Sequence, residues 1–171
     1  MEFTLQDGAN LALIIGGLCG ALSVWLLFRE LRENNKLTRA ANTQALVELS
    51  APFYLGLIQN RQMAELYVQG GKSTDGMDEV DLYRYKNLLV WWLVFHENIY
   101  YQWRNGLLDN HSYKPWAIDL KLFVRKQNIS LHWEEMSHLF QDEFANHLTR
   151  LVEEGSRGGV ARPQGHAGAK R

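Results

Sequence analysis

The feature that most constrains this chain is an uncharged apolar run close to its N-terminus. Residues 11–28, with the sequence LALIIGGLCGALSVWLLF, contain no charged side chain. At about 1.5 Å per residue a helix of this length is about 27 Å long, which is close to the hydrocarbon thickness of a bilayer. Helices in a soluble core usually carry a polar face, whereas this run has no polar position beyond Ser23. We therefore predict a single transmembrane helix.

The flanks of the run indicate a retained anchor rather than a cleaved signal peptide. A signal peptide has a basic segment before its apolar core and a small-residue cleavage site after it. Here Glu2 and Asp7 precede the run, and Arg29-Glu30-Leu31-Arg32 follows it. The order of charges is thus the reverse of the one that a signal peptide requires.

Basic residues lie on one side of the run only. Arg29, Arg32, Lys36 and Arg39 follow it, and no Lys or Arg precedes it. Because cytoplasmic flanks of transmembrane helices are enriched in Lys and Arg, we expect residues 1–10 to be external and the C-terminal body to be cytoplasmic.

The charge balance of the body argues against nucleic acid as a partner. The chain has 18 Lys and Arg residues against 19 Asp and Glu residues. Four of the basic residues and none of the acidic ones fall in residues 155–171, so residues 1–154 carry a net charge of −5. A surface that binds phosphate backbones needs an excess of basic residues on the folded part. We interpret the glycine-rich segment 155–171 as a disordered basic tail.

Helical patterns account for the rest of the chain, and no segment has the alternation of a strand. Residues 29–49 contain no Gly or Pro and are expected to continue the anchor as a helical stalk. Ser50 and Pro52 indicate a new helix start. Within the body, residues 50–154, we expect helices over residues 52–69, 79–105, 113–126 and 130–153. The predicted fold is all-α, with one N-terminal transmembrane helix and a cytoplasmic bundle of about four helices.

Two sequence features predict how the helices of that bundle pack. The helix over 79–105 contains the eight-residue apolar run Leu88–Phe95, which is too short to span a bilayer and so predicts a central position. The last helix carries apolar residues at spacings of three and four, which predicts one buried face. These residues are Met136, Phe140, Phe144, Leu148 and Leu151.

The strongest candidate for a polar site is Glu97, which directly follows the apolar run and His96. Tyr100, Tyr101 and Arg104 lie one to two turns further along the same helix. A carboxylate this deep in a bundle needs a charged or hydrogen-bonding partner. We expect Arg104, Arg84 or Arg61 to supply it. Glu97 is then either a polar tie between helices or part of a pocket with the two tyrosines.

Metal and cofactor sites have weak support in the sequence. The single Cys excludes an intramolecular disulfide and a Cys-based zinc site. His96-Glu97 resembles the start of a zinc-protease motif, but Tyr100 occupies the place of the second histidine. Glu135 and His138 form one copy of a pair that di-iron bundles use twice, so they are weak candidate ligands. We expect no cofactor.

Gly16 and Gly20 form a small-xxx-small pair within the apolar run. Such a pair lets two transmembrane helices pack closely, although glycines are also common in spans that do not associate. The pair therefore leaves self-association through the anchor open.

The order of motifs in the body resembles a broad group of uncharacterised bacterial proteins. These are small helical proteins with an N-terminal membrane anchor and a domain of unknown function, and the similarity covers residues 60–152. The residues that carry it are Met63-Ala-Glu-Leu-Tyr67, Arg84-Tyr-Lys-Asn-Leu88, Glu97-Asn-Ile-Tyr-Tyr-Gln102, Gly106-Leu-Leu-Asp109, Trp116, Trp133 and Phe140-x-x-x-Phe144. The resemblance implies an all-α fold and a bacterial inner-membrane location, and it supports Glu97 as a candidate site residue. It implies no activity, so it assigns no catalytic residue.

The leading functional hypothesis is a non-catalytic, membrane-anchored interaction or adapter module. A strong anchor and a well-packed body occur without a complete catalytic constellation. The expected partners are the lipid bilayer and either another protein or a second copy of the chain, with no nucleic acid. The alternative is a small ligand sensor or enzyme, with or without a metal, whose pocket surrounds Glu97.

Overall fold

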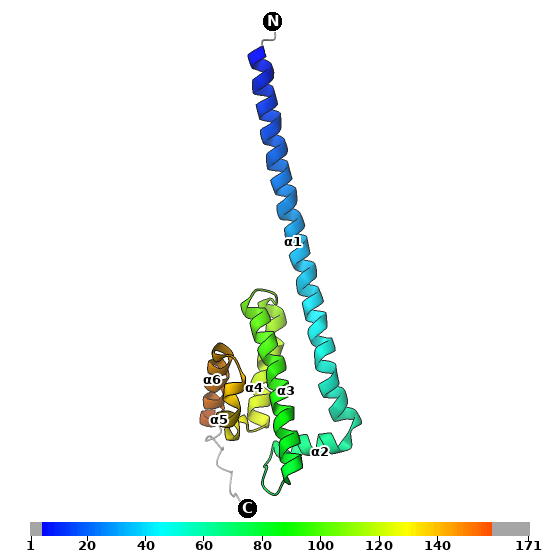
Figure 1. Ribbon diagram of the computed structural model, residues 1–171, viewed down its shortest axis with the longest axis vertical. Coiled ribbons are helices and arrows are strands. Elements are labelled where there is room, and N and C mark those ends of the chain that lie inside the picture. The colour runs from blue at the N-terminus through cyan, green and yellow to red at the C-terminus, as the bar shows by residue number, and fades with distance from the viewer. Residues whose placement is uncertain (1–4, 159–171) are drawn as a thin grey trace, which may run out of the picture. The chain divides into compact units, whose positions relative to one another are not determined.

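A computed structural model describes the backbone of residues 5–158 and the side chains of residues 13–155, and every regular element in this part of the chain is helical (Figure 1). The predicted all-α class is confirmed. The α-helices are α1 (Leu5–Gln59), α2 (Arg61–Gly70), α3 (Glu79–Arg104), α4 (Asn110–Lys126), α5 (Trp133–Met136) and α6 (Asp142–Gly158). Two short 3₁₀ helices, η1 (Ile129–Leu131) and η2 (Ser137–Leu139), flank α5. Most of the predicted basic tail, residues 159–171, lies outside the described residues.

The chain divides into two units, one comprising residues up to Asn42 and the other beginning at Thr43. The first unit is the N-terminal part of α1. Its apolar side chains from Leu13 to Phe28 are all solvent-exposed, and α1 is the one helix in the described part of the chain that is long and apolar enough to cross a membrane. The second unit, which we call the body, contains the last turns of α1 and all the other helices.

The predicted helix start at Ser50 is wrong, because α1 continues through Pro52 to Gln59. Ser50 does not cap a new helix; its hydroxyl donates to the backbone oxygen of Val47 at 2.9 Å. Leu46 and Phe53, seven residues apart and so on one helix face, are both buried in the body. Phe53 also stacks on Trp92 of α3 at a centroid distance of 4.1 Å. An uninterrupted helix places both side chains in the core, which offsets the hydrogen bond that proline lacks.

The actual break lies at Asn60. This residue is extended, with φ −115° and ψ 104°, and its side chain accepts a hydrogen bond from the backbone N–H of Met63. Asn is among the best N-cap residues, so α2 begins directly after it. The predicted end at the Gly70-Gly71 pair is confirmed, since α2 ends at Gly70.

Gly70 also allows a close approach between α2 and α3. A Cβ at this position would lie 2.3 Å from a ring carbon of Tyr85. The Tyr85 hydroxyl in turn donates to the backbone and side-chain oxygens of Gln127, at 3.1 and 3.0 Å. Asn128 donates to the backbone oxygen of Gly71 at 2.8 Å. The end of α2 is therefore fixed against both α3 and the end of α4.

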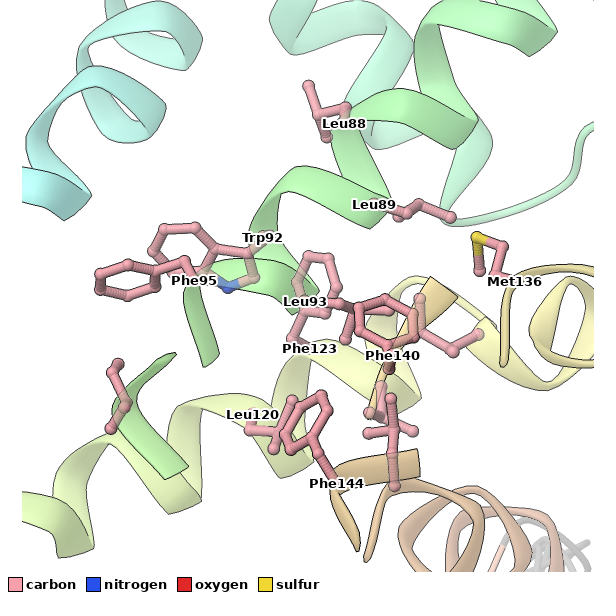
Figure 2. Close-up of a cluster of buried hydrophobic side chains, with 14 of the residues drawn as sticks. Leu88, Leu89, Trp92, Leu93, Phe95, Leu120, Phe123, Met136, Phe140 and Phe144 are labelled. Atoms are coloured by element: carbon pink, nitrogen blue, oxygen red, sulfur yellow. The ribbon is translucent and has the colours of Figure 1, made fainter. Parts of the chain in front are cut away.

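The central position of α3 is confirmed. Its N-cap, Asp78, accepts from the backbone N–H of Asp81, and Gly106 with φ +72° follows its last turn. Figure 2 shows Leu89 and Leu93 of α3 directed toward side chains from α4 and from the segment that leads into α6. The labelled neighbours are Leu120 and Phe123 of α4, Met136 and Phe140 of the segment before α6, and Phe144 of α6 itself, all of them buried.

The prediction of one helix over residues 130–153 is wrong in its first half. Residues 129–139 instead form η1, α5 and η2, and Phe140 is extended with φ −114° and ψ 157°. Trp133 explains the irregular path: its ring stacks on Phe140 at 5.7 Å and its indole N–H donates to Thr149 of α6 at 2.9 Å. The expected buried face still forms, because Met136, Phe140, Phe144 and Leu148 are all buried, with Leu151 half-buried.

Candidate functional site

Glu97 is a polar tie between α3 and α6. Its side chain is half-buried, and its Oε1 accepts a hydrogen bond of 2.8 Å from the backbone N–H of Gln141. Gln141 directly precedes α6, and the first N–H groups of a helix have no partner inside the helix. From a neighbouring helix, Glu97 thus satisfies the backbone N–H that the Glu or Gln of a capping box usually satisfies within the same helix. A carboxylate near a helix N-terminus also interacts favourably with the helix dipole.

The prediction that an arginine neutralises Glu97 is wrong. Each of the three candidate arginines makes its ion pair with another acid. These pairs are Arg104 with Glu143 at 2.7 Å, Arg84 with Asp81 at 3.1 Å and Arg61 with Glu65 at 2.7 Å. Glu97 remains partly solvated, so a backbone N–H suffices where a fully buried carboxylate would need a cation.

Tyr100 and Arg104 meet at Glu143 of α6. The Tyr100 hydroxyl donates to Glu143 Oε1 at 3.2 Å, and that same oxygen accepts from Arg104. The Tyr100 ring stacks on His147 with centroids 5.0 Å apart. Burial, and then the charge of Glu143, raise the pKa of Tyr100 above its usual value, whereas burial lowers the pKa of His147. This group joins α3 to α6 one turn beyond the Glu97 contact.

Tyr101 lies at the edge of this group. Its ring meets that of Tyr100 edge-on, with centroids 5.4 Å apart and planes at 83°. The four residues predicted as one site are therefore divided: Tyr100 and Arg104 share Glu143, Tyr101 supports Tyr100, and Glu97 binds a separate backbone group. The polar bonds of Glu97, Tyr100 and Arg104 all join α3 to α6.

A pair formed by buried His96 and half-buried Asp119, which the sequence did not indicate, lies on another face of α3. His96 is 2% exposed, and its Nε2 lies 3.1 Å from Asp119 Oδ2 of α4. The aromatic rings of Trp92, Phe95 and Trp116 surround the imidazole edge-on. Burial lowers the pKa of His96, and the nearby Asp119 opposes this effect. One signal was available: His96 continues the spacing of Leu89 and Leu93, which predicts a buried position.

The weak metal candidates do not gather a ligand set. The Glu135 carboxylate pairs with Lys86 Nζ at 2.6 Å, an interaction that lowers the pKa of Glu135. His138 lies in η2 and is exposed. Within the described residues no group of three or more His, Cys, Asp or Glu side chains has a geometry that fits a metal ion.

An open apolar groove of about 360 Å³ lies between α2 and α3. Its lining is Met63, Leu66, Tyr83, Arg84, Asn87, Leu88 and Trp91. On α3 the exposed side chains of the groove continue a row at spacings of three and four, which places them on one helix face. We call this row the α3 stripe; it comprises Val80, Tyr83, Asn87, Trp91 and Val94.

The α3 stripe exposes two large aromatic side chains on the surface of the body. Tyr83 is 69% exposed and Trp91 40% exposed, although their neighbours Leu88 and Trp92 are buried. Aromatic residues are enriched at the centres of protein interfaces, and a contiguous exposed apolar row usually marks a binding surface.

Gly16 and Gly20 lie on the exposed apolar part of α1. A Cβ at either position would meet no other atom within 4 Å, so glycine is not required there by a contact within the described chain. Packing of two anchors through this pair stays a prediction.

Comparison with known proteins finds no match among family models, curated proteins or solved structures. The resemblance to membrane-anchored bacterial proteins of unknown function therefore stays a prediction.

Proposed function

We propose that this chain is a single-pass membrane protein whose body binds a helix of another protein in the α2–α3 groove and catalyses no reaction. The observation that carries the proposal is the α3 stripe. It leaves Tyr83 and Trp91 exposed on the central helix of a body whose other large side chains on that helix are mostly buried.

The polar groups of the body support a binding role over a catalytic one. Glu97 is engaged by the backbone of Gln141, and Tyr100 and Arg104 are engaged by Glu143. These contacts hold helices together, so the alternative of a ligand pocket around Glu97 has less support. A groove with apolar walls and two polar residues, Arg84 and Asn87, suits an amphipathic helix with anchors at spacings of three and four.

The location proposed for the body is the cytoplasmic side of a bacterial inner membrane. The exposed apolar segment of α1 supports the span, and Arg29, Arg32, Lys36 and Arg39 after it support the orientation. A reporter fused after Arg171 should be active only when it requires the cytoplasm. Activity of a reporter that works only on the outer side would contradict this orientation.

Site-specific photo-crosslinking in native membranes tests the binding role. A photoreactive residue in place of Tyr83 should give an adduct that the same residue in place of Leu122 does not give. Leu122 is a suitable control because it is an exposed apolar residue, at 50%, on α4. Mapping the adduct should identify an amphipathic helix of a second protein, and Trp91→Asp should abolish it.

Two results of this experiment would contradict the proposal. Equal adducts from the two positions would mean that the stripe has no special role. An adduct between two differently tagged copies of this chain would assign the groove to self-association instead.

A further inference from the structure

The segment of α1 that follows the apolar run carries a second surface, which the groove does not explain. Arg29, Arg32 and Lys36 recur at spacings of three and four, so they lie along one face of the helix. All three are exposed, and α1 has no break in this segment (Figure 1). Arg29 shares its charge with Glu33 at 3.5 Å, and the described residues give Arg32 and Lys36 no ion-pair partner.

The cationic face is joined to an aromatic one. Trp25, Phe28 and Leu31 line a shallow hollow of about 630 Å³ along α1, together with Arg29, Arg32 and Asn35. The end of the hollow at Trp25 and Phe28 is therefore apolar, and both arginines lie toward its other end, beside Leu31 and Asn35. A phospholipid has the same division along its length, with acyl chains at one end and a phosphate at the other.

Helix geometry places the cations at the depth of lipid phosphates. With a rise of about 1.5 Å per residue, Arg29 and Arg32 follow Phe28 by about 2 and 6 Å. The headgroup region extends roughly 5–8 Å beyond the hydrocarbon on each side. Lys36 lies about 12 Å beyond Phe28. It therefore interacts with the same headgroups only through a weaker, salt-screened attraction.

We propose that this face of α1 is a binding site for anionic phospholipid. Arg29 and Arg32 hold the phosphate, since the guanidinium fork matches its oxygens, and one acyl chain lies along Trp25 and Phe28. Zwitterionic lipids are bound less well, because their own ammonium group offsets the phosphate charge. The site rests on the membrane span under the proposed function, but it does not depend on the groove.

Lipid retention by the full chain tests the site. The protein is placed in nanodiscs with equal amounts of phosphatidylglycerol and phosphatidylcholine, and native mass spectrometry then counts the lipids that remain bound. One basic residue near an anionic surface is equivalent to a factor of about five in binding. We expect phosphatidylglycerol to be enriched roughly tenfold or more around the unmodified chain, and the enrichment to fall by at least tenfold in the double variant Arg29→Gln, Arg32→Gln.

The matched control is the double variant Arg61→Gln, Arg125→Gln, which removes the same charge from exposed arginines of the body. It should keep the full enrichment. Equal enrichment in the α1 variant and the unmodified chain would overturn the lipid site, as would an equal loss in the control. Failure of the unmodified chain to enter nanodiscs would instead contradict the membrane span itself.

Discussion

The two units of this protein use similar apolar side chains in opposite ways. Leu13 in the first unit is 74% exposed, whereas Leu89 in the body is fully buried. The body supplies its own apolar surroundings by packing several helices together, but the first unit is one helix with none. Burial of apolar surface drives folding at about 25 cal/mol per Å². The apolar part of the first unit has no such surroundings among the described residues, and its length and composition would allow it to cross a membrane.

The largest expected effect lies in the core of the body. Trp92→Ala removes a ring that is 1% exposed and stacks on Phe53 and Phe95. We expect the free energy of unfolding to fall by about 3–5 kcal/mol, measured by urea denaturation. Trp91→Ala is the comparison, because this neighbour is 40% exposed and should cost less than Trp92→Ala although its ring also lies 5.4 Å from that of Phe53. Equal losses in the two variants would mean that the body is packed differently.

A charged residue placed in the apolar run tests whether the first unit lies in a membrane. Leu18, which is 66% exposed, lies near the middle of the run. Leu18→Arg should cost about 2.5–3.5 kcal/mol of membrane insertion and leave the unfolding of the body unchanged. The fraction of protein released by alkaline carbonate is the measurement. The control Leu122→Arg, at an exposed position of the body, should release no protein from the membrane. A lower free energy of unfolding of the body in the Leu18 variant would show that the apolar run packs against protein instead.

The tie at Glu97 predicts a smaller effect. Glu97→Ala leaves the Gln141 N–H without its acceptor, so we expect a loss of about 0.5–2 kcal/mol in unfolding free energy, typical of a removed helix cap. Glu97→Gln keeps an acceptor oxygen and should lose less than the alanine variant. Unchanged thermal stability in Glu97→Ala would refute the structural role and favour the alternative of a pocket around Glu97.

The smallest effect is the pH dependence contributed by His96. Burial lowers its pKa in the folded protein below the usual 6.5, so the unfolded chain takes up the proton more readily. The stability that this group contributes is fully present above pH 6.5 and is lost as the pH falls further. His132 and His147 have lowered pKa values too, so the test is a comparison. His96→Gln should show a shallower loss of melting temperature between pH 7.5 and 5 than the unmodified protein; equal slopes would contradict the assignment.

The parts of the fold that could be predicted from the sequence are those with local signals. The bounds of α3 follow from Gly106 just beyond its end and from the absence of Gly and Pro in residues 79–105. Tertiary contacts explain the errors. Phe53 stacking on Trp92 carries α1 past Pro52, and Trp133 bonded to Thr149 replaces a helix with short turns. Neither contact has a signature in the local pattern.

The candidate site shows the same limit. Glu97 was recognised as a polar residue that needs a partner, but its partner is a backbone N–H, and every residue except proline offers one. Asp119 lies 23 residues from His96, on a different helix, so sequence spacing does not connect them. Patterns within one helix thus indicate which polar residues need a hydrogen-bond partner, whereas the fold determines which group that partner is.

The hydrogen bond from Gln141 to Glu97 also makes one backbone amide sensitive to the separation of α3 and α6. The amide hydrogen of Gln141 is protected by a side chain of α3, so it should exchange with solvent whenever the two helices separate, even while α6 remains helical. Its exchange rate, followed by deuterium uptake at a single residue, measures the opening of the body apart from the fraying of a helix end. Partner binding at the α3 stripe would slow that rate if it stiffened α3.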